Sequence, residues 1–537
     1  MSYQPFVCAC PICAGGKSLV PGGSSGSSLL PAPPNPVIAN PIYGDYRIDS
    51  LVENAQYRWN KDSAPGTSVN VTYSFMSAKP TYGGTDEIAS GTGIGFTPLT
   101  QQQIDATRAV FARVASETGL RFNEISDSST SYGQIRLGNN TQSTSAGYAY
   151  MPNSTGDDKD GDIWLDKTDP ANLINLAPGT SAYATLIHEI GHALGLKHPG
   201  NYNGGEPVVP SAVGNFLGQR EDNLNYSIMS YRDAPGATGV QRDWFGTYDL
   251  LTLRALYGSG TAQTGNTNYA LGDSAGRALS IIYDANGVDT LDVSSSAVDS
   301  KIDLRPGAFS SIGVGAAGPA SNNISIDFFT IIENFVGSSR NDAVTGNAAN
   351  NTFNLGGGTN SADGGTGVDT AVYGAAANIY RIANTAGTLT VTGNGAVDTL
   401  TNIERLQFSD KKLAFDANAL TTAKILGAVF GKVSVANTEY AGIGLSILDA
   451  GSSYADLMKL ALNARLGVGA SNEVVVTTLY TNLVGNAPNA SELNFYSGLI
   501  SSGQLSQTQL GMVAADNALN IVNIDLVGIA ATGLLFI

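Results

Sequence analysis

Cysteine, histidine and charged residues are all scarce in this chain of 537 residues. The three cysteines, Cys8, Cys10 and Cys13, lie within the first thirteen residues, so disulfides cannot hold the body of the protein together. Charged residues make up only 14% of the chain, and the formal net charge is −17. Because lysine and arginine are not in surplus, we expect the chain to bind neither nucleic acid nor an anionic membrane.

Long apolar runs and an N-terminal export signal are missing as well. No apolar run reaches the roughly 18–20 residues that a membrane-spanning helix needs, and the C-terminal run IDLVGIAATGLLFI is too short. The N-terminus has no basic region followed by an apolar region and a small-residue cleavage site, so no Sec signal is predicted. We therefore expect a soluble protein without a membrane span.

Composition changes along the chain and predicts several separate segments. The first is rich in Gly, Ser and Pro and is typical of a linker. The second carries strand and helix patterns, including a helix at 99–119 with Thr100 as its N-cap. The third alternates short β-rich pieces with Gly, Asn and Asp, and the fourth returns to helical spacing. Their expected limits are 1–44, 45–262, 263–416 and 417–537.

The sequence HEIGHALGLKH contains every histidine of the chain. His188 and His192 are four residues apart on a helix predicted at 181–196, so both rings leave the same face and can reach one ion at about 2.0–2.1 Å. Gly195 is expected to end the helix in a sharp turn that returns His198 as a third ligand. Three neutral imidazoles leave a coordination position open, which is typical of a catalytic Zn²⁺ site.

Glu189 follows the first histidine and is placed to hold a metal-bound water and to act as its base. The alternative is a helix whose histidines serve packing or solubility. Composition weighs against that alternative, because a chain with only three histidines has all of them in this one motif. The extended motif, with a glycine and a third histidine, is far more specific than HExxH alone.

Together with SIMSY at 227–231, the sequence HEIGHALGLKHPG resembles the metzincin clan and, within it, the serralysin family of bacterial proteases. The resemblance includes YRWNKD, VTYSF, AGYAYMP and DLLTLRALYG. It implies that Met229 lies in a turn beneath the zinc and that Tyr231 is an additional ligand, which swings away to stabilise the oxyanion. The strand AGYAYMP would pair with an extended substrate, with broad peptide specificity as the consequence.

A nine-residue period occupies the third segment. Residues 364–372, GGTGVDTAV, match the calcium β-roll repeat, and frames beginning at 337, 346 and 355 keep the register. The eighth positions are apolar, as a stacked roll requires and an ordinary Gly-rich loop, the alternative, does not. Half of the sixth positions hold an amide, which lowers the expected Ca²⁺ affinity. The sixth positions are Asp342, Asn351, Asn360 and Asp369, and the eighth are Val344, Phe353, Ala362 and Ala371.

Calcium ligands are implied by the resemblance and by the repeat. The segment at 283–294 resembles the start of the serralysin calcium domain, although Gln263 and Asn266 stand where the family usually has Arg and Asp. The acidic run at 157–162 is interpreted as a solvated turn in preference to a calcium loop. The candidate calcium residues are Asp284, Asp289, Asp292, Glu333, Asp342, Gly365, Gly367 and Asp369.

Both ends of the chain leave alternatives open. Cys8, Cys10 and Cys13 belong either to a disposable pro-segment without a thiol role, to a latency switch in which a thiolate occupies the open zinc position, or to a small separate metal site. Residues 475–505 resemble a bacterial helical domain of unknown function that often follows calcium repeats. The terminus GLLFI fits a signal read by a type I secretion apparatus, and the alternative is a tail packed on its own domain.

These observations predict a multidomain α+β protein. After a pro-segment and linker, we expect a metzincin α/β catalytic domain, a parallel β-roll domain, and a small helical domain with the secretion signal. The predicted function is a secreted, extracellular zinc metalloendopeptidase, made as a zymogen and supported by Ca²⁺, that acts on protein or peptide substrates. One rival is a surface-layer or matrix protein whose proteolysis is incidental, with a surface partner for its C-terminal part. The other is a pseudo-enzyme with structural zinc, which would have no need of Glu189.

Overall fold

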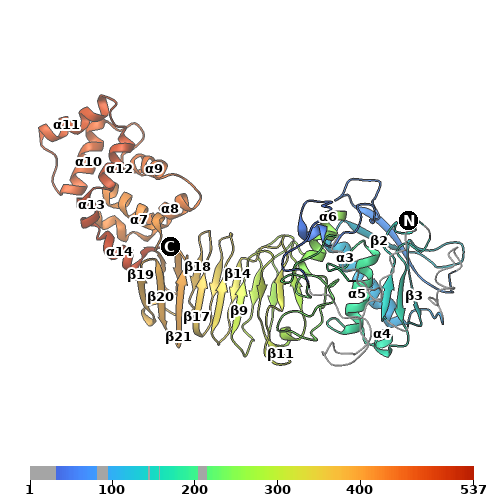
Figure 1. Ribbon diagram of the computed structural model, residues 1–537. Coiled ribbons are helices and arrows are strands. Elements are labelled where there is room, and N and C mark those ends of the chain that lie inside the picture. The colour runs from blue at the N-terminus through green and yellow to red at the C-terminus, as the bar shows by residue number, and fades with distance from the viewer. Residues whose placement is uncertain (1–31, 81–94, 143–144, 157, 203–213) are drawn as a thin grey trace. The chain divides into compact units, whose positions relative to one another are not determined.

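The computed structural model describes residues 32–80, 95–142, 145–156, 158–202 and 214–537 (Figure 1). Cys8, Cys10, Cys13 and Asp157 of the acidic run lie outside the described residues. The chain forms two compact units, one made of residues up to 289 together with 296–331, and one made of residues 290–295 together with 332–537. Strands and helices occur in both, so the protein is a multidomain mixed α/β protein.

The first unit contains a five-stranded sheet in the order β2-β1-β3-β5-β4. Strands β1 to β3 and β5 run parallel, while β4 pairs with β5 in the antiparallel direction and forms one edge. Val71 and Tyr73 of β1 enter the core, as the alternation at 68–75 predicts. The strands are β1 (Val69–Phe75), β2 (Leu120–Glu124), β3 (Ile135–Asn140), β4 (Gly147–Ala149) and β5 (Ile163–Asp166).

Helices of the first unit pack on this sheet through one shared core. Helix α3 begins after Thr100, whose hydroxyl accepts from the Gln103 amide as the predicted N-cap. Helix α5 begins after Thr180, and every residue from Ala182 to its end is buried. The helices are α1 (Tyr46–Asp49), α3 (Gln101–Glu117), α4 (Pro170–Ile174), α5 (Ser181–Ala193) and α6 (Thr247–Tyr257).

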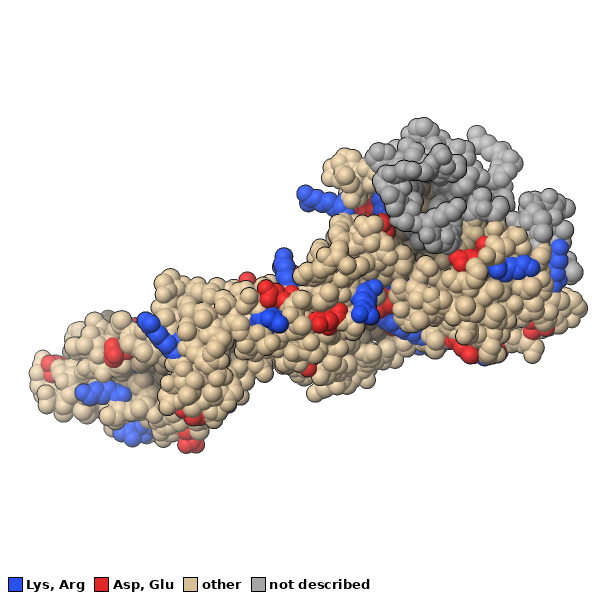
Figure 2. Space-filling model, turned by 90° about the horizontal axis from the view of Figure 1, so that it is seen from below, with Lys and Arg blue, Asp and Glu red and all other residues tan. Residues whose placement is uncertain are grey.

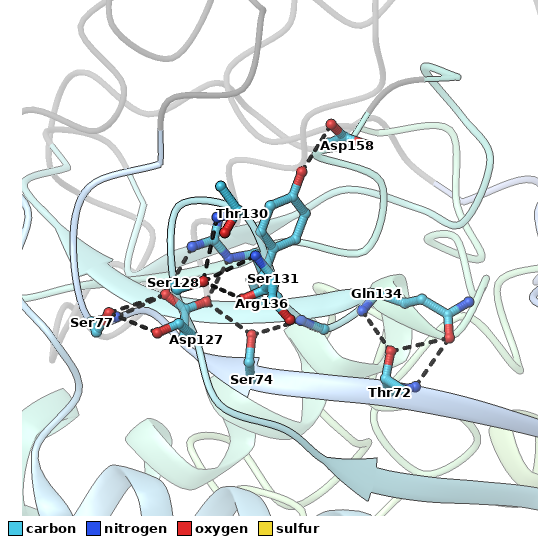
Figure 3. Close-up of polar contacts among 12 residues, drawn as sticks. Thr72, Ser74, Ser77, Asp127, Ser128, Thr130, Ser131, Gln134, Arg136 and Asp158 are labelled. Atoms are coloured by element: carbon cyan, nitrogen blue, oxygen red, sulfur yellow. Dashed lines mark hydrogen bonds and ion pairs between the residues drawn. The ribbon is translucent and has the colours of Figure 1, made fainter.

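A buried ion pair fixes the loop between β2 and β3 (Figure 3). Asp127 accepts two hydrogen bonds from the Arg136 guanidinium, at 2.8 and 2.9 Å, and both side chains are 3% exposed. The Ser74 hydroxyl and the Ser77 amide also donate to Asp127. The bidentate pair and the two further donors together occupy the lone pairs of this buried carboxylate. The loop is therefore held against β1.

Short strands fill the remainder of the first unit. β10, β13 and β7 form a small sheet, and β11 and β12 form a hairpin. A 3₁₀ turn at Asp273–Arg277 precedes β7. The strands are β6 (Asn268–Ala270), β7 (Ser280–Ile282), β9 (Ser300–Asp303), β10 (Phe309–Ser310), β11 (Val314–Gly315), β12 (Gly318–Pro319) and β13 (Ile324–Ile326).

Three pairs of neighbouring parallel strands in the second unit, β14 with β16, β16 with β18 and β15 with β17, are offset by 18 residues, which is twice the nine-residue period. In one sheet Asn334 pairs with Thr352, and in the other Ala343 pairs with Ser361. The four eighth-position side chains are at most 3% exposed. The first sheet includes β8 (Thr290–Asp292), β14 (Asn334–Val336), β16 (Thr352–Asn354), β18 (Thr370–Val372) and β22 (Arg405–Gln407), and the second includes β15 (Asp342–Thr345), β17 (Gly358–Asp363), β21 (Ala396–Thr401), β20 (Thr388–Gly393) and β19 (Arg381–Thr385).

Helices follow these strands in the second unit and have their own apolar core. The Arg405 guanidinium ties β22 to them, because it binds Asp416 at 2.7 Å and Asp449 at 2.8 Å. The helices are α7 (Ala417–Ile425), α8 (Thr438–Asp449), α9 (Tyr454–Leu466), α10 (Asn472–Val484), α11 (Ala490–Ser501), α12 (Gln507–Ala515), α13 (Ala518–Asn523) and α14 (Leu526–Thr532). None of the helices in the described part of the chain is long and apolar enough to span a bilayer.

The last residues of the chain form a strand, β24 (Leu534–Phe536), that pairs in the antiparallel direction with β23 (Lys412–Ala414). The tail is therefore packed on its own unit, as one of the two alternatives for GLLFI expected. Elsewhere on the surface, Figure 2 shows lysine and arginine as small separate patches, several of them beside Asp or Glu. The described part of that face presents no continuous basic surface of the kind that nucleic acid requires.

Candidate metal centre

Helix α5 and the turn after it bring all three histidines together. His188 and His192 leave one face of the helix, and the chain turns at Gly195, whose φ is +98°. A Cβ on Gly195 would lie 2.3 Å from the Tyr57 carbonyl oxygen, so no other residue fits this turn. The Nε2 atom of His198 lies 3.2 Å from that of His188 and 3.1 Å from that of His192.

Hydrogen bonds turn the three rings toward a common point. Each Nδ1 lies near a backbone carbonyl oxygen, that of Ile228 at 2.9 Å for His188, of Leu196 at 2.7 Å for His192 and of Tyr202 at 3.3 Å for His198. Since a carbonyl only accepts, each Nδ1 carries the proton and each Nε2 keeps a lone pair.

The donor set fits a zinc ion. Burial, followed by the neighbouring His188, lowers the pKa of His192 well below its usual value and keeps the ring neutral. Three neutral nitrogens facing one another would repel without a cation between them. Nitrogens at about 2.0–2.1 Å from one tetrahedral ion stand roughly 3.3–3.4 Å apart, close to the spacing observed. In the described residues this is the one group of three or more His, Cys, Asp or Glu side chains with such geometry.

Glu189 is fully buried beside the triad. Its carboxylate lies against the backbone of edge strand β4, since a Cβ on Gly147 would lie 2.8 Å from Glu189 Cγ and 3.1 Å from Oε1. Only glycine at position 147 leaves this carboxylate in place. The contact joins the expected base to the strand expected to pair with substrate.

A turn containing Met229 lies directly against helix α5. Met229 is fully buried, and a Cβ on Gly191 would lie 2.7 Å from its sulfur. Asp249 of α6 fixes this turn, because its carboxylate accepts from the Ser227 hydroxyl at 2.6 Å and from the Ile228 amide at 2.7 Å. Burial raises the pKa of Asp249, although these hydrogen bonds oppose the shift. Through the Ile228 carbonyl the turn also orients His188.

Tyr231 lies at the triad, with its ring centroid 4.3 Å from that of His198. The Tyr202 ring stacks on Tyr231 at 4.9 Å and on His198 at 5.9 Å, and the Tyr202 hydroxyl accepts from the Tyr231 amide at 3.2 Å. The same hydroxyl donates to the buried Asp222 at 2.5 Å, and the Ser230 hydroxyl and the Arg232 guanidinium donate to that carboxylate as well. Burial, together with Asp222, raises the pKa of Tyr202, so it remains a neutral phenol.

Candidate calcium residues of the first unit are Asp284 and Asp289. The Tyr269 hydroxyl donates to Asp284 at 2.8 Å, and the Thr267 amide donates to Asp289 at 2.8 Å. Both carboxylates are buried. Their oxygens therefore already serve as hydrogen-bond acceptors within the unit.

The other calcium candidates belong to the second unit. Asp292 accepts from the Ser294 amide, and Asp342 accepts from the Ser338 amide and hydroxyl. Asp369 is fully buried, and burial raises its pKa to about 7. Gly365 and Gly367 have φ of +93° and +138° and lie against backbone carbonyls one repeat pair earlier. Glu333 precedes β14 in the same unit.

Several residues around the histidines were missed by the sequence analysis. Asp249 and Asp222 orient the Met229 turn and the Tyr202–Tyr231 pair, and Gly147 makes room for Glu189. Asp249 carried a detectable signal, since it stands at the third position of helix α6 after a glycine and caps the helix. Asp222 carried none, because an acidic residue in a loop outside any motif has no pattern.

Comparison with known proteins gives matches in both parts of the chain. The family model described as Matrixin matches residues 96–203, and the one described as Peptidase M10 serralysin C terminal matches residues 248–434. Serralysin B of Dickeya chrysanthemi is 31% identical over 329 residues, which cover 55% of this chain and 63% of that protein. Serralysin of Proteus mirabilis is 30% identical over 326 residues, with the same coverage of 55% and 63%.

A third relative, metalloprotease AprA of Pseudomonas entomophila (strain L48), is 30% identical over 323 residues, covering 55% of this chain and 62% of that protein. The chain thus matches less than two thirds of the length of these relatives. Its buried histidine triad on a helix and turn, with a methionine turn against the helix, is the arrangement expected of a metzincin, and the Matrixin model matches the residues that carry the triad. Within that class, the two family models and the relatives of about 30% identity support a serralysin-type metzincin, in agreement with the resemblance stated above.

Proposed function

We propose that this chain is a secreted zinc metalloendopeptidase. The observation that carries the proposal is the convergence of three neutral Nε2 atoms beside a fully buried glutamate. His188, His192 and His198 would hold the zinc, which polarises the substrate carbonyl and acidifies water when bound. The remaining chemistry belongs to the side chains.

Glu189 is the general base. Its carboxylate takes a proton from the attacking water and delivers it to the nitrogen of the leaving amine, so the same group acts first as base and then as acid. Because the carboxylate is buried against the Gly147 backbone, it cannot turn away from the reacting groups. Its position next to His188 in the helix sets its distance from the site.

Tyr231 is proposed as an additional zinc ligand and as the donor to the developing oxyanion. The Tyr202 hydroxyl fixes the backbone of this residue by accepting from the Tyr231 amide, and the stacked Tyr202 ring holds the Tyr231 phenol beside His198. A phenol that donates to an oxyanion stabilises the charge that appears only in the transition state.

Substrate binding is assigned to edge strand β4, which includes Gly147 beside the catalytic carboxylate. An extended peptide would add to this edge through backbone hydrogen bonds, which depend little on side chains. Broad peptide specificity follows. A type I secretion apparatus exports the protease. Its natural substrates are proteins or peptides that it meets outside the cell.

The repeats of the second unit are proposed to form a parallel β-roll that binds Ca²⁺ where carboxylates remain, with a helical domain after it. The 18-residue strand register and the buried eighth positions support the roll. The candidate ligands are Asp292, Glu333, Asp342 and Asp369, with backbone oxygens near Gly365 and Gly367. Asp284 and Asp289 are the candidates of the first unit. A leader containing Cys8, Cys10 and Cys13 would maintain latency until it is removed.

Casein digestion by the purified full chain tests the proposal, with and without a zinc chelator and beside Glu189→Gln. We expect the chelator to abolish digestion and Glu189→Gln to lower it by about 10²–10⁴-fold while zinc stays bound. Undiminished digestion by Glu189→Gln would move the chemistry to another group. A folded, zinc-loaded wild type without protease activity would favour the pseudo-enzyme, and surface binding that survives Glu189→Gln would favour the matrix protein.

A further inference from the structure

Residues 33–40 pass along the segment that follows the third histidine. Val37 and Phe216 form an antiparallel bridge, with one N–H···O distance of 2.9 Å and one of 2.7 Å. The Gln219 amide donates to the Pro33 carbonyl at 2.6 Å. A Cβ on Gly218 would lie 2.7 Å from the Asn35 carbonyl carbon, so the two backbones are in direct contact. We call residues 33–40 the strap.

Asn215 holds the strap with both ends of its amide. Its Oδ1 accepts from the Ala39 and Asn40 amides, each at 3.0 Å, and its Nδ2 donates to the Asn40 carbonyl at 2.8 Å. The side chain is only 7% exposed. Three hydrogen bonds from one buried side chain to two adjacent residues fix the strap more firmly than a single contact does.

Downstream, the strap continues into a second anchored turn. Asp49 is fully buried, and its carboxylate accepts from the amides of Ile42, Tyr43 and Gly44 at 2.7–3.0 Å. Residues 42–44 are therefore fixed on helix α1, and Ile42 and Tyr43 also pack against the core of the first unit. The expected boundary at 44/45 runs through a stretch that is hydrogen-bonded on both sides.

The contacts of the strap lead to His198. The Lys197 ammonium donates to the Asn215 carbonyl at 2.7 Å and to the His198 carbonyl at 3.1 Å. The Leu217 amide donates to the Pro199 carbonyl at 2.8 Å, and the Lys197 amide donates to the Leu51 carbonyl at 2.9 Å. The segment that the strap covers thus contacts both neighbours of His198, through the Lys197 side chain and the Pro199 carbonyl.

From these contacts we infer that residues 33–44 are a permanent part of the catalytic unit, that they position His198 through Asn215, and that any removable leader ends before residue 33. The inference rests on the proposed zinc site, whose third ligand is the residue positioned. Asn215 is a positioning residue, because it acts on His198 through Lys197 and touches no reacting group. Groups beyond the ligands of a metal commonly change its affinity by about 10–100-fold.

Asn215→Ala in the full chain removes all three bonds to the strap and is the direct test. We expect zinc affinity, measured by competition with a chromogenic chelator, to fall about tenfold, with kcat lowered and KM within about twofold of wild type. Asn215→Asp keeps the acceptor for two of the bonds and should recover part of the affinity. Asn40→Ala is the matched control, because Asn215 bonds only the backbone of Asn40. Zinc affinity and kcat should stay unchanged in this variant.

Unchanged zinc affinity and kcat in Asn215→Ala would overturn the inference even if thermal stability fell, since stability alone would mean an ordinary structural contact. The N-terminus of the processed protein, found by intact mass, gives a second readout. A first residue at or before 33, or no processing, supports the inference, and a first residue beyond 33 overturns it. Zinc binding is measured apart from proteolysis, so absent casein digestion with an intact affinity difference would refute only the proposed protease.

Discussion

The metal centre and the repeat region respond differently to changes of side chain. At the metal centre each ring has one carbonyl partner and one lone pair that points at a shared position, so no substitute for His188, His192 or His198 supplies the same atoms. In the repeats, aspartate occupies two of the four sixth positions and asparagine the other two, while the strand register is kept. A site that binds an ion depends on particular atoms, whereas a stacked sheet depends on period and on buried apolar side chains.

Asparagine in the repeats makes its own internal bonds. Asn351 donates to the Ile332 and Glu333 carbonyls and accepts from the Asn347 amide, and Asn360 donates to Asp398 at 2.8 Å. Those amide groups donate to carbonyl and carboxylate oxygens within the unit. Asp369 has no such donor group, and its raised pKa records the cost of burying a carboxylate.

Phe353→Ala would break the repeat region most severely. Phe353 is fully buried at an eighth position, and losing such a ring costs about 3–5 kcal/mol. We expect faster hydrogen exchange in β14, β16 and β18, measured by mass spectrometry on the full chain. Asn354→Ala, at an exposed neighbouring position, should leave exchange unchanged. Equal protection in Phe353→Ala would mean that the eighth positions do not carry the stack.

Tyr231→Phe sharpens the description of the metal centre. Removal of one oxyanion donor costs about 10²–10³ in kcat, so we expect a loss of this size with zinc still bound. Hydrolysis of a fluorogenic peptide, with zinc measured in the same preparation, checks the result. If kcat falls less than twofold, the phenol takes no part in the transition state.

Asp249→Asn tests the support beneath His188. The amide keeps the size of the side chain but replaces one acceptor of the Ser227 and Ile228 bonds by a donor, so the Met229 turn should loosen. We expect zinc affinity to fall about 10–100-fold, measured by chelator competition. Asp243→Asn, an acidic residue of the preceding loop that bonds Ser280, is the control. If Asp249→Asn and Asp243→Asn bind zinc with the same affinity, the Met229 turn has no role in orienting His188.

Asp369→Asn should have the smallest effect, and one that depends on pH. Burial raises the pKa of Asp369 to about 7, so the folded state favours the neutral acid. Its contribution to stability is present below the unfolded pKa of about 4 and is lost as the pH rises through 7. In a calcium chelator, the variant should exceed wild type in thermal stability at pH 8 and equal it near pH 4. Added Ca²⁺ should favour wild type, and a pH-independent difference would refute this account.

The sequence alone predicted the structural features that follow from the spacing of residues. The helix predicted at 181–196, which the structure ends three residues earlier at Ala193, the turn at Gly195 and the convergence of three histidines follow from helical geometry, and the inward eighth positions follow from the nine-residue period. Asp222 could not be singled out among 45 acidic residues, because its role arises from contacts formed only in the fold, and the capping position of Asp249 gave no hint of its bonds to the Met229 turn. Asn215 and the strap lie some 175 residues apart in sequence.

Calcium-binding carboxylates do not differ in sequence pattern from other carboxylates, and the reason is physical. A carboxylate that binds an ion and one that accepts from a nearby amide or hydroxyl have the same sequence context. Asp284 accepts a hydrogen bond from Tyr269 and Asp289 accepts one from Thr267, and no sequence motif predicts these contacts.

The number and kind of zinc ligands is the most direct test of the metal centre. X-ray absorption at the zinc edge, with metal analysis of the same full-length sample and of His198→Ala, measures both. The account predicts one zinc per chain, bound by three imidazole nitrogens with at least one oxygen, and loss of that ion in His198→Ala. Absence of zinc from protein purified in its presence, or an unchanged spectrum in His198→Ala, would contradict it.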